Sequence, residues 1–261
     1  MQYQDILYEV NDRVATITIN RPQVLNAFRA LTCDELVHAF RDAGYDREVG
    51  AIVLTGAGTR AFCTGGDQSG HADGVYAGGR GPIGMAVGEL HTAIRDAAKP
   101  VIAKVRGYAI GGGNVLATIC DLTLAAESAI FGQVGPKMGS VDPGFGTAYL
   151  ARVVGEKKAR EMWYLCRRYS AAEALAMGLV NAVFPDDQLD AGVAEWCAEL
   201  VERSPTAIAL AKTSFNADSE SIRGLGAMAF EAVALYYGTD ESKEGVAALR
   251  DKRKPDFRKR S

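Results

Sequence analysis

The turn that decides the fold reads Tyr108-Ala109-Ile110-Gly111-Gly112-Gly113, and it lies between two patterned segments. An apolar, strand-like run at residues 101–105 precedes it, and a helix-like run at residues 114–120 follows it. A glycine turn in this position leaves bare backbone N–H groups at the start of a helix. Those groups, together with the helix dipole, stabilise negative charge on a bound oxygen.

A second glycine-rich turn follows the strand-like run at residues 51–55 and reads Thr64-Gly65-Gly66-Asp67-Gln68. Each of the two turns can present one backbone N–H to the same ligand oxygen. Such a pair of donors forms an oxyanion hole, which stabilises the charge that develops on a carbonyl oxygen during acyl chemistry. The sequence therefore predicts a site for a reacting carbonyl group between the two turns.

The length and composition allow a sizeable hydrophobic core. The 261 residues are 48% hydrophobic, which fits one large domain or one domain with a helical appendage. The formal net charge of −3 argues against general nucleic-acid binding, although the run from Lys252 to Arg260 is locally basic. That run is either a solvated tail or a site for the phosphates of a ligand.

Cysteine and histidine usage argues against a disulfide framework and against a metal site. Five cysteines occur with no CxxC spacing, and the chain has three histidines, so a reducing compartment is expected. Residues 1–5 lack the basic start and apolar core of a signal peptide. No apolar run reaches the roughly 18 residues that cross a bilayer. We therefore predict a cytoplasmic protein with no membrane or nucleic-acid partner.

Hydrophobic periodicity predicts an alternating first half and a helical second half. Strands are predicted at residues 6–10, 14–19, 51–55, 101–105, 122–125 and 179–184. Helices are predicted at residues 32–43, 89–95, 114–120, 156–166, 171–177, 187–203, 205–216, 224–237 and 241–250. Thr32 is the expected N-cap of the first helix, with Glu35 three residues later, and residues 69–84 are expected to form a surface loop. We predict a core at residues 1–200 and a helical region at residues 201–261.

Four motifs occur in an order and spacing that resemble the enoyl-CoA hydratase/isomerase, or crotonase, superfamily. They are residues 60–67 (RAFCTGGD), 107–113 (GYAIGGG), 120–122 (CDL) and 131–133 (FGQ). The resemblance implies an α/β fold, a crotonase-like spiral of ββα units with a helical C-terminal trimerisation region, in a homotrimer or a dimer of trimers. It also implies an acyl-CoA substrate, no covalently bound cofactor, and a thioester oxygen held by the N–H groups of Gly66 and Gly112.

The chain departs from the hydratases of this superfamily at both catalytic positions. In hydratases one glutamate stands two residues after the triple glycine, and a second stands two residues after Phe-Gly-Gln. Those positions hold Val115 and Gly135 in this chain. Because the addition of water to a double bond needs an acid and a base within reach of both carbons, ordinary hydratase activity is not expected.

Residues 133–144 resemble a narrower branch that makes or breaks carbon–carbon bonds beside a CoA thioester. Residues 89–95, 113–120, 140–144 and 236–242 are similar to its 2-ketocyclohexane-1-carboxyl-CoA hydrolases, which open a ring in benzoate and alicyclic acid degradation. The 1,4-dihydroxy-2-naphthoyl-CoA synthases of menaquinone synthesis are near relatives that close a ring. At the positions that match residues 140–144, these synthases more often read Ser-Phe-Asp-Gly-Gly.

Three residues are candidates for the chemistry of this branch. Asp142 lies in an apolar, glycine-rich context, where desolvation raises the pKa of a carboxyl group; otherwise it caps a turn. Ser140 is expected to hydrogen-bond the second carbonyl of the substrate or the carboxylate, unless it only caps a helix. Tyr237 matches a tyrosine that this branch donates into the neighbouring subunit's site to move a proton at the α-carbon; otherwise it packs in the core.

The resemblance also implies residues that bind the substrate. Arg29 and Lys252 match residues that contact CoA, and a guanidinium suits phosphate recognition; a surface salt bridge is the alternative for Arg29. Tyr76, in the glycine-rich loop, is expected to close over the ring. The pantetheine and thioester are expected to lie along Thr64, Gly65, Asp67, Gln68, Tyr108, Gly111 and Val134. A bicarbonate site in one class of naphthoyl synthases is matched by Gln133, Gly135 and Trp163, although core packing also explains Trp163.

The leading hypothesis from the sequence is therefore the ring-opening hydrolysis of a cyclic β-keto acyl-CoA. The naphthoyl-CoA synthase reaction is the first alternative, because it uses the same enolate and the same residues. A non-catalytic acyl-CoA-binding or RNA-binding homologue is the second alternative. The acidic balance and the intact glycine turns argue against this last class.

Overall fold

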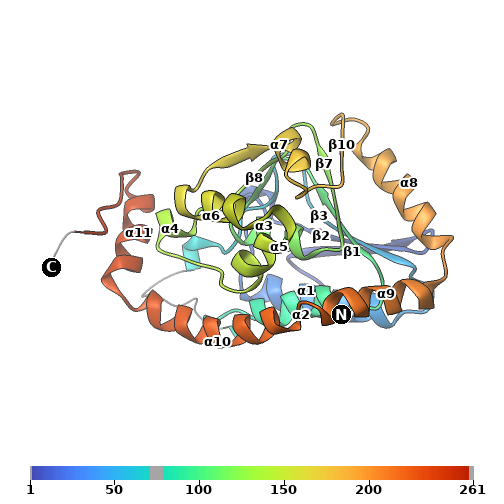
Figure 1. Cartoon of the computed structure of the whole chain (residues 1–261), viewed down its shortest axis with the longest axis horizontal. Coiled ribbons are helices and arrows are strands. Elements are labelled where there is room, and N and C mark those ends of the chain that lie inside the picture. Colours follow the sequence, from blue (N-terminus) through green and yellow to red (C-terminus); the bar gives the residue numbers. More distant parts are fainter. Residues whose placement is uncertain (1, 71–78, 259–261) are drawn as a thin grey trace.

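The computed structural model describes residues 2–70 and 79–258, which form two β-sheets surrounded by helices (Figure 1). The larger sheet has six strands in the order β1-β2-β3-β5-β7-β10. β1 and β2 are antiparallel, whereas the other neighbouring pairs of this sheet are parallel. The strand bounds are β1 (Ile6–Asn11), β2 (Val14–Ile19), β3 (Ala51–Gly56), β5 (Val101–Val105), β7 (Leu122–Ala126) and β10 (Ala182–Phe184).

The smaller sheet contains four strands of three residues each, in the order β4-β6-β8-β9. They are β4 (Ala61–Cys63), β6 (Tyr108–Ile110), β8 (Ile130–Gly132) and β9 (Arg168–Ser170). β6 pairs in parallel with β4 on one side and with β8 on the other. The carboxyl ends of three parallel strands lie at one edge of a sheet. The turn after β4, the triple glycine after β6 and Gln133 after β8 therefore begin side by side.

Helices cover both sheets and continue into the C-terminal region. α1 (Ala30–Tyr45) packs on α2 (Val87–Asp96), and α10 (Glu220–Tyr237) contacts α2. In Figure 1, α9 and α10 run one after the other past α1 and α2, and α11 turns back toward α4. The remaining helices are α3 (Gly112–Ile119), α4 (Gly135–Met138), a π-helix (Phe145–Tyr149), α5 (Leu150–Val154), α6 (Glu156–Leu165), α7 (Ala171–Ala176), α8 (Leu189–Val201), α9 (Pro205–Ala217) and α11 (Asp240–Arg250).

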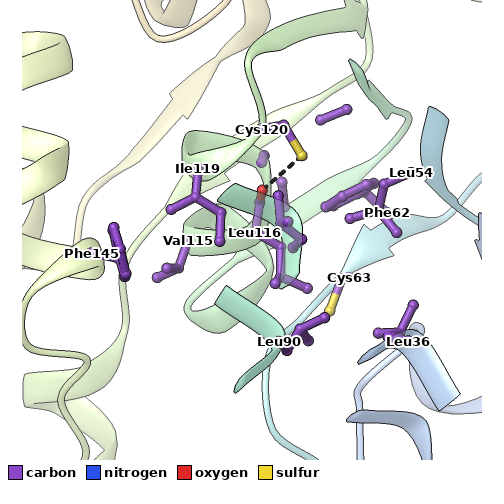
Figure 2. Close-up of a cluster of buried hydrophobic side chains, with 14 of the residues drawn as sticks. Leu36, Leu54, Phe62, Cys63, Leu90, Val115, Leu116, Ile119, Cys120 and Phe145 are labelled. Atoms are coloured by element: carbon purple, nitrogen blue, oxygen red, sulfur yellow. Dashed lines mark hydrogen bonds between the residues drawn. The ribbon is translucent and has the colours of Figure 1, made fainter. Parts of the chain in front are cut away.

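The main hydrophobic core lies between α1, α2, α3 and the two sheets. Figure 2 shows part of it, with Leu36 of α1, Leu90 of α2 and Leu116 of α3 in one buried cluster. Val115 belongs to the same cluster and is fully buried. The position that carries a catalytic glutamate in hydratases is therefore occupied here by a core side chain.

The predicted strands and helices are all present, and the α/β fold with a helical C-terminal region is confirmed. The periodicity missed the four three-residue strands of the smaller sheet and the short helices α4 and α5, because so few residues carry no recognisable period. The expected cap was wrong. Arg29 is the N-cap of α1, and Thr32 is its N3 residue, whose hydroxyl accepts a hydrogen bond from the Arg29 N–H at 3.1 Å.

Glu35 also differs from the expected role as a partner of that cap. Its carboxylate accepts hydrogen bonds from the backbone N–H groups of Gln4 and Asp5 at 2.7 and 2.8 Å, so it joins the N-terminal segment to α1.

Within residues 2–70 and 79–258, no helix combines the length and the apolar character needed to cross a membrane.

Candidate active site

A cavity of about 460 Å³ opens where the loops after β4, β6 and β8 meet. Its walls include both glycine turns, the segment from Gln133 to Asp142, and Phe230 and Tyr237 of α10. The cavity thus gathers segments that lie far apart along the chain. Among the predicted binding residues, the cavity lining includes Thr64, Gly65, Gly66, Asp67, Gln68, Gly111, Gly112, Gln133, Val134, Gly135, Ser140, Asp142, Trp163 and Tyr237.

The two glycine turns are in direct contact. A Cβ added to Gly65, whose φ is +86°, would lie 2.9 Å from the backbone nitrogen of Gly112, so the close approach requires glycine. Gly112 is the first residue of α3, and its N–H therefore has no acceptor within the helix. The N–H of Gly112, which has no acceptor within α3, therefore lies next to the turn that carries Gly66.

The turn around Gly66 is oriented by a β-bridge to Phe28. The Phe28 N–H donates to the Gly65 carbonyl, and the Asp67 N–H donates to the Phe28 carbonyl, both at 2.8 Å. In a parallel bridge of this kind, the middle residue directs its own N–H away from the partner strand. The N–H of Gly66 is thus directed away from Phe28, and Gly66 itself lines the cavity.

Asp67 lines the cavity, but its carboxylate holds the turn in place. It accepts from the Ser69 N–H at 3.0 Å and from the Arg21 guanidinium at 2.9 Å. Burial opposes the charged form, yet the hydrogen bonds from Ser69 and Arg21 outweigh it and lower the pKa of Asp67. Asp67 therefore favours its ionised form and supports the glycine turn.

Asp142 is the other carboxylate that lines the cavity in the described part of the chain. Its side chain is 15% exposed, and one oxygen accepts a hydrogen bond from the Gly146 N–H at 3.1 Å. Burial raises the pKa of Asp142 from 3.8 to about 7, although the Gly146 hydrogen bond opposes the shift. A carboxyl group with this pKa can take up and release a proton near neutral pH.

Ser140 and Tyr237 form a pair of hydroxyl groups beside this carboxylate. The Ser140 Oγ lies 2.9 Å from the Tyr237 Oη. Burial raises the pKa of Tyr237, the Ser140 hydrogen bond lowers it, and the charge of Asp142 raises it. Within this chain Tyr237 lines the cavity, and its donation into a neighbouring subunit's site stays a prediction.

His91, for which the sequence pattern predicts no role, lies on α2 behind Asp142. The His91 Nε2 is 3.9 Å from Oδ2 of Asp142, and the imidazole side chain is 2% exposed. Burial lowers the pKa of His91 to about 3, so the ring is neutral at pH 7. A lone histidine between Leu90 and Ile94 on an amphipathic helix was the only available sequence signal, and it is shared by ordinary core histidines.

The predicted anion site is only partly assembled. Gln133 is buried, and its amide nitrogen and oxygen have no hydrogen-bond partner among the described residues. A Cβ at Gly135 would lie 2.5 Å from the Ser140 carbonyl oxygen, so this position has no room for a side chain. The indole N–H of Trp163 donates to the Gly146 carbonyl and is therefore committed within the protein.

Arg29 and Lys252, which the resemblance predicted as CoA contacts, do not line the cavity. Arg29 forms a bidentate pair with Asp5, at 2.7 and 2.8 Å, and does not line the cavity. Lys252 is exposed just after α11, also outside the cavity lining, and Tyr76 lies outside the described residues. Arg168 of β9 was not predicted, yet it is the cation in the described lining and lies 5.4 Å from the ring of Tyr108.

The chain is similar to known proteins over almost its whole length. The family model for enoyl-CoA hydratase/isomerase matches residues 9–260. The chain is similar to the crystal structure of an enoyl-CoA hydratase from Mycobacterium avium subsp. paratuberculosis K-10, with a TM-score of 0.87 and 31% identity over 98% of this chain and 99% of that one. An enoyl-CoA hydratase/isomerase from Pseudoalteromonas atlantica T6c gives a TM-score of 0.87 and 27% identity, covering 97% of this chain and 100% of that one.

Proposed function

Because the chain belongs to the enoyl-CoA hydratase/isomerase (crotonase) family of acyl-CoA-processing enzymes, we propose that it hydrolyses a ring carbon–carbon bond. The substrate class is a cyclic β-keto acyl-CoA, with 2-ketocyclohexane-1-carboxyl-CoA as the specific candidate. One observation carries the proposal. A single carboxylate with a pKa of about 7, Asp142, lines the cavity beside the Ser140–Tyr237 pair, while the two glutamate positions of hydratases hold Val115 and Gly135.

The first step is the attack of water on the ring ketone. Ionised Asp142 takes a proton from the water, and the resulting hydroxide adds to the ketone carbon. Ser140 hydrogen-bonds the ketone oxygen as it becomes negatively charged. This assignment uses Asp142 as the base and leaves Asp67, which is paired with Arg21, in a supporting role.

The second step breaks the bond between the former ketone carbon and the α-carbon of the thioester. The bonding electrons move onto the thioester oxygen, which the N–H groups of Gly66 and Gly112 stabilise as an enolate. Loss of one donor of this kind costs roughly 3–4 kcal/mol in other acyl-transfer sites. The former ketone carbon leaves the step as a carboxyl group.

The third step returns a proton to the α-carbon. Tyr237 lies in hydrogen-bond contact with Ser140 and donates this proton, which Asp142 replaces through the hydroxyl pair. One water is consumed, the thioester stays intact, and no oxidant or reductant is needed. A six-membered ring gives pimeloyl-CoA, so CoA acts as part of the substrate and no further cofactor is required.

Ring closure by a naphthoyl-CoA synthase is the second candidate function, and one observation favours it. The buried amide of Gln133 has no partner among the described residues, so its donor and acceptor are uncommitted and suit a bicarbonate ion. Trp163 does not supply a second free donor, because its indole N–H is bonded to Gly146.

We also propose, from the resemblance, a homotrimer or dimer of trimers through the helical C-terminal region.

A mass-spectrometric assay of the purified protein tests the proposal. With 2-ketocyclohexane-1-carboxyl-CoA, we expect a product that has gained one water and has kept CoA. Loss of water from o-succinylbenzoyl-CoA, with no turnover of the first substrate, would make the protein a ring-closing synthase. Asp142→Asn should abolish turnover, whereas Asp187→Asn, at an exposed surface position, should not. Equal binding of acyl-CoA by both variants without any turnover would indicate a non-catalytic homologue.

A further inference from the structure

His91 occupies a position that ordinary core packing does not explain. Its imidazole is buried, with Phe145 edge-on at 5.6 Å and Phe230 at 6.0 Å between ring centroids. Buried polar atoms in folded proteins nearly always have hydrogen-bond partners. In the described part of the chain, Nδ1 of His91 has none, and Nε2 faces Oδ2 of Asp142 at 3.9 Å.

The surroundings select one tautomer of this neutral ring. If Nδ1 carried the proton, a buried N–H donor would have no acceptor, and the lone pair of Nε2 would face a carboxylate. If Nε2 carries the proton, the donor faces the carboxylate, and only an acceptor lone pair at Nδ1 remains unpaired. The second arrangement is favoured, because charge-assisted hydrogen bonds to carboxylates are the stronger kind.

We propose that His91 is a positioning residue that donates its Nε2–H to Oδ2 of Asp142 and so keeps the carboxylate ionised and correctly aimed. The separation of 3.9 Å must close by about 1 Å to reach a normal hydrogen-bond length. Catalytic hydrogen bonds are often long before substrate binds and tighten in the complex. Gly146 holds the other oxygen, so the two donors together fix the plane of the carboxylate.

Other titratable groups near this pair come from several elements. Tyr237 of α10 faces Asp142, and Tyr149 accepts a hydrogen bond from Arg95, one turn beyond His91, at 2.6 Å. Glu89 of α2 is paired with Arg80 at 2.8 Å on the surface, and it also faces Arg41 of α1 at 3.6 Å. The pairs formed by Arg95 and Glu89 are not changed in any variant below. They therefore do not contribute to differences between the pH profiles of the variants.

This inference rests on the proposed role of Asp142 as the base, and a pH profile tests it. We expect His91→Phe, which keeps an aromatic ring but removes the donor, to move the midpoint of the kcat/KM profile up by about one pH unit. The rate at low pH then falls about ten-fold and recovers at high pH. His91→Gln restores an N–H at the end of the side chain. The midpoint in this variant should lie most of the way back toward that of the parent protein. His38→Gln is the matched control, because His38 contacts Tyr3 and Asp42 instead.

Two outcomes would overturn the inference. An equal loss of kcat/KM at every pH in His91→Phe would mean that His91 only fills space. Full activity in Asp142→Asn would instead remove the proposed function, and this variant separates the two failures. Because His91→Phe could fold poorly, its thermal unfolding is compared with that of His91→Gln. If only His91→Gln folds, the midpoint of its kcat/KM profile must still lie close to that of the parent protein.

The tautomer gives a test that needs no substrate. The chain contains three histidines, so ¹⁵N-histidine labelling of the full-length protein gives few signals, and those of His91 are identified by their loss in His91→Gln. We expect a neutral ring protonated at Nε2 from pH 8 down to about pH 5, since the pKa of His91 is lowered to about 3. A ring protonated at Nδ1 would contradict the proposal whatever the activity measurements show.

Discussion

The hydroxyl of Ser140 lies 2.9 Å from the hydroxyl of Tyr237, although 97 positions separate the two residues in the chain. Ser140 follows α4, whereas Tyr237 is the last residue of α10. The contact therefore ties the end of the longest C-terminal helix to the loop that carries Asp142. It also makes the helical C-terminal region part of the site, in addition to any role in assembly.

Removal of the Tyr237 hydroxyl should separate proton transfer from substrate binding. We expect Tyr237→Phe to lower kcat by about 10²- to 10⁴-fold, the range for loss of a general acid, with little change in KM. The matched control is Tyr236→Phe, because Tyr236 is the neighbouring residue but does not line the cavity. Steady-state kinetics with the ring substrate measure both variants. An equal loss in the two would show that the phenol acts only through helix packing.

The raised pKa of Asp142 predicts opposite trends for activity and stability. The base limb of kcat/KM should rise with pH and have its midpoint near 7, because Asp142 must be ionised to accept a proton. The folded-state pKa lies above the ordinary 3.8, so the folded protein binds more protons between about pH 4 and 7. The free energy of unfolding contributed by this group therefore falls as pH rises through that window.

Asp142→Asn should lose activity and gain stability above pH 7. A shift of about three pKa units corresponds to at most about 4 kcal/mol, and partial solvation makes the gain smaller. Urea unfolding of both proteins at pH 4 and pH 8 measures this difference. If the variant gains as much stability at pH 4 as at pH 8, the ionised carboxylate is not the source of the destabilisation.

Gly112→Ala tests the backbone oxyanion hole. The added Cβ would lie 2.8 Å from Cζ of Phe28 and 3.1 Å from Cα of Gly65, so the two turns must separate. We expect kcat to fall about 10²- to 10³-fold, as for loss of one oxyanion donor. The control is Gly224→Ala on α10, where a Cβ meets nothing within 4 Å; it should raise stability by about 0.5–1 kcal/mol and leave kcat unchanged. Comparable kcat values in the two variants would argue against the assigned oxygen site.

We predict that Arg168 contacts the phosphates of CoA, a role that the sequence pattern did not indicate. Its guanidinium lines the cavity beside Tyr108, and the phosphates of CoA are anions that arginine binds well. We expect Arg168→Gln to raise KM by about ten-fold, since loss of a hydrogen bond to a charged group costs about 1.5 kcal/mol, while kcat stays near its original value. Arg167→Gln is the neighbouring control, because Arg167 contacts Glu161 at 3.5 Å instead. A larger effect of salt on KM in the parent than in Arg168→Gln would support the same contact.

Local pattern carried the prediction of the larger sheet. In β2, Ala15, Ile17 and Ile19 are buried and alternate with less buried residues, as the period-two pattern requires. The short strands of the smaller sheet could not be found in this way, because three residues cannot establish a period. Yet these strands bring the turn at Gly66, the turn at Gly112 and Gln133 to one edge, and this edge forms the cavity.

The sequence by itself determined the glycine turns, the absence of both hydratase glutamates at Val115 and Gly135, and Asp142 as the candidate base. These are properties of single positions, because each depends on which side chain or bare backbone a residue carries. Only the tertiary structure decided that Tyr237 meets Ser140, that His91 lies behind Asp142, and that the charge of Arg29 is paired with Asp5. Such contacts join residues whose local patterns are independent of each other, so packing of the whole chain selects them.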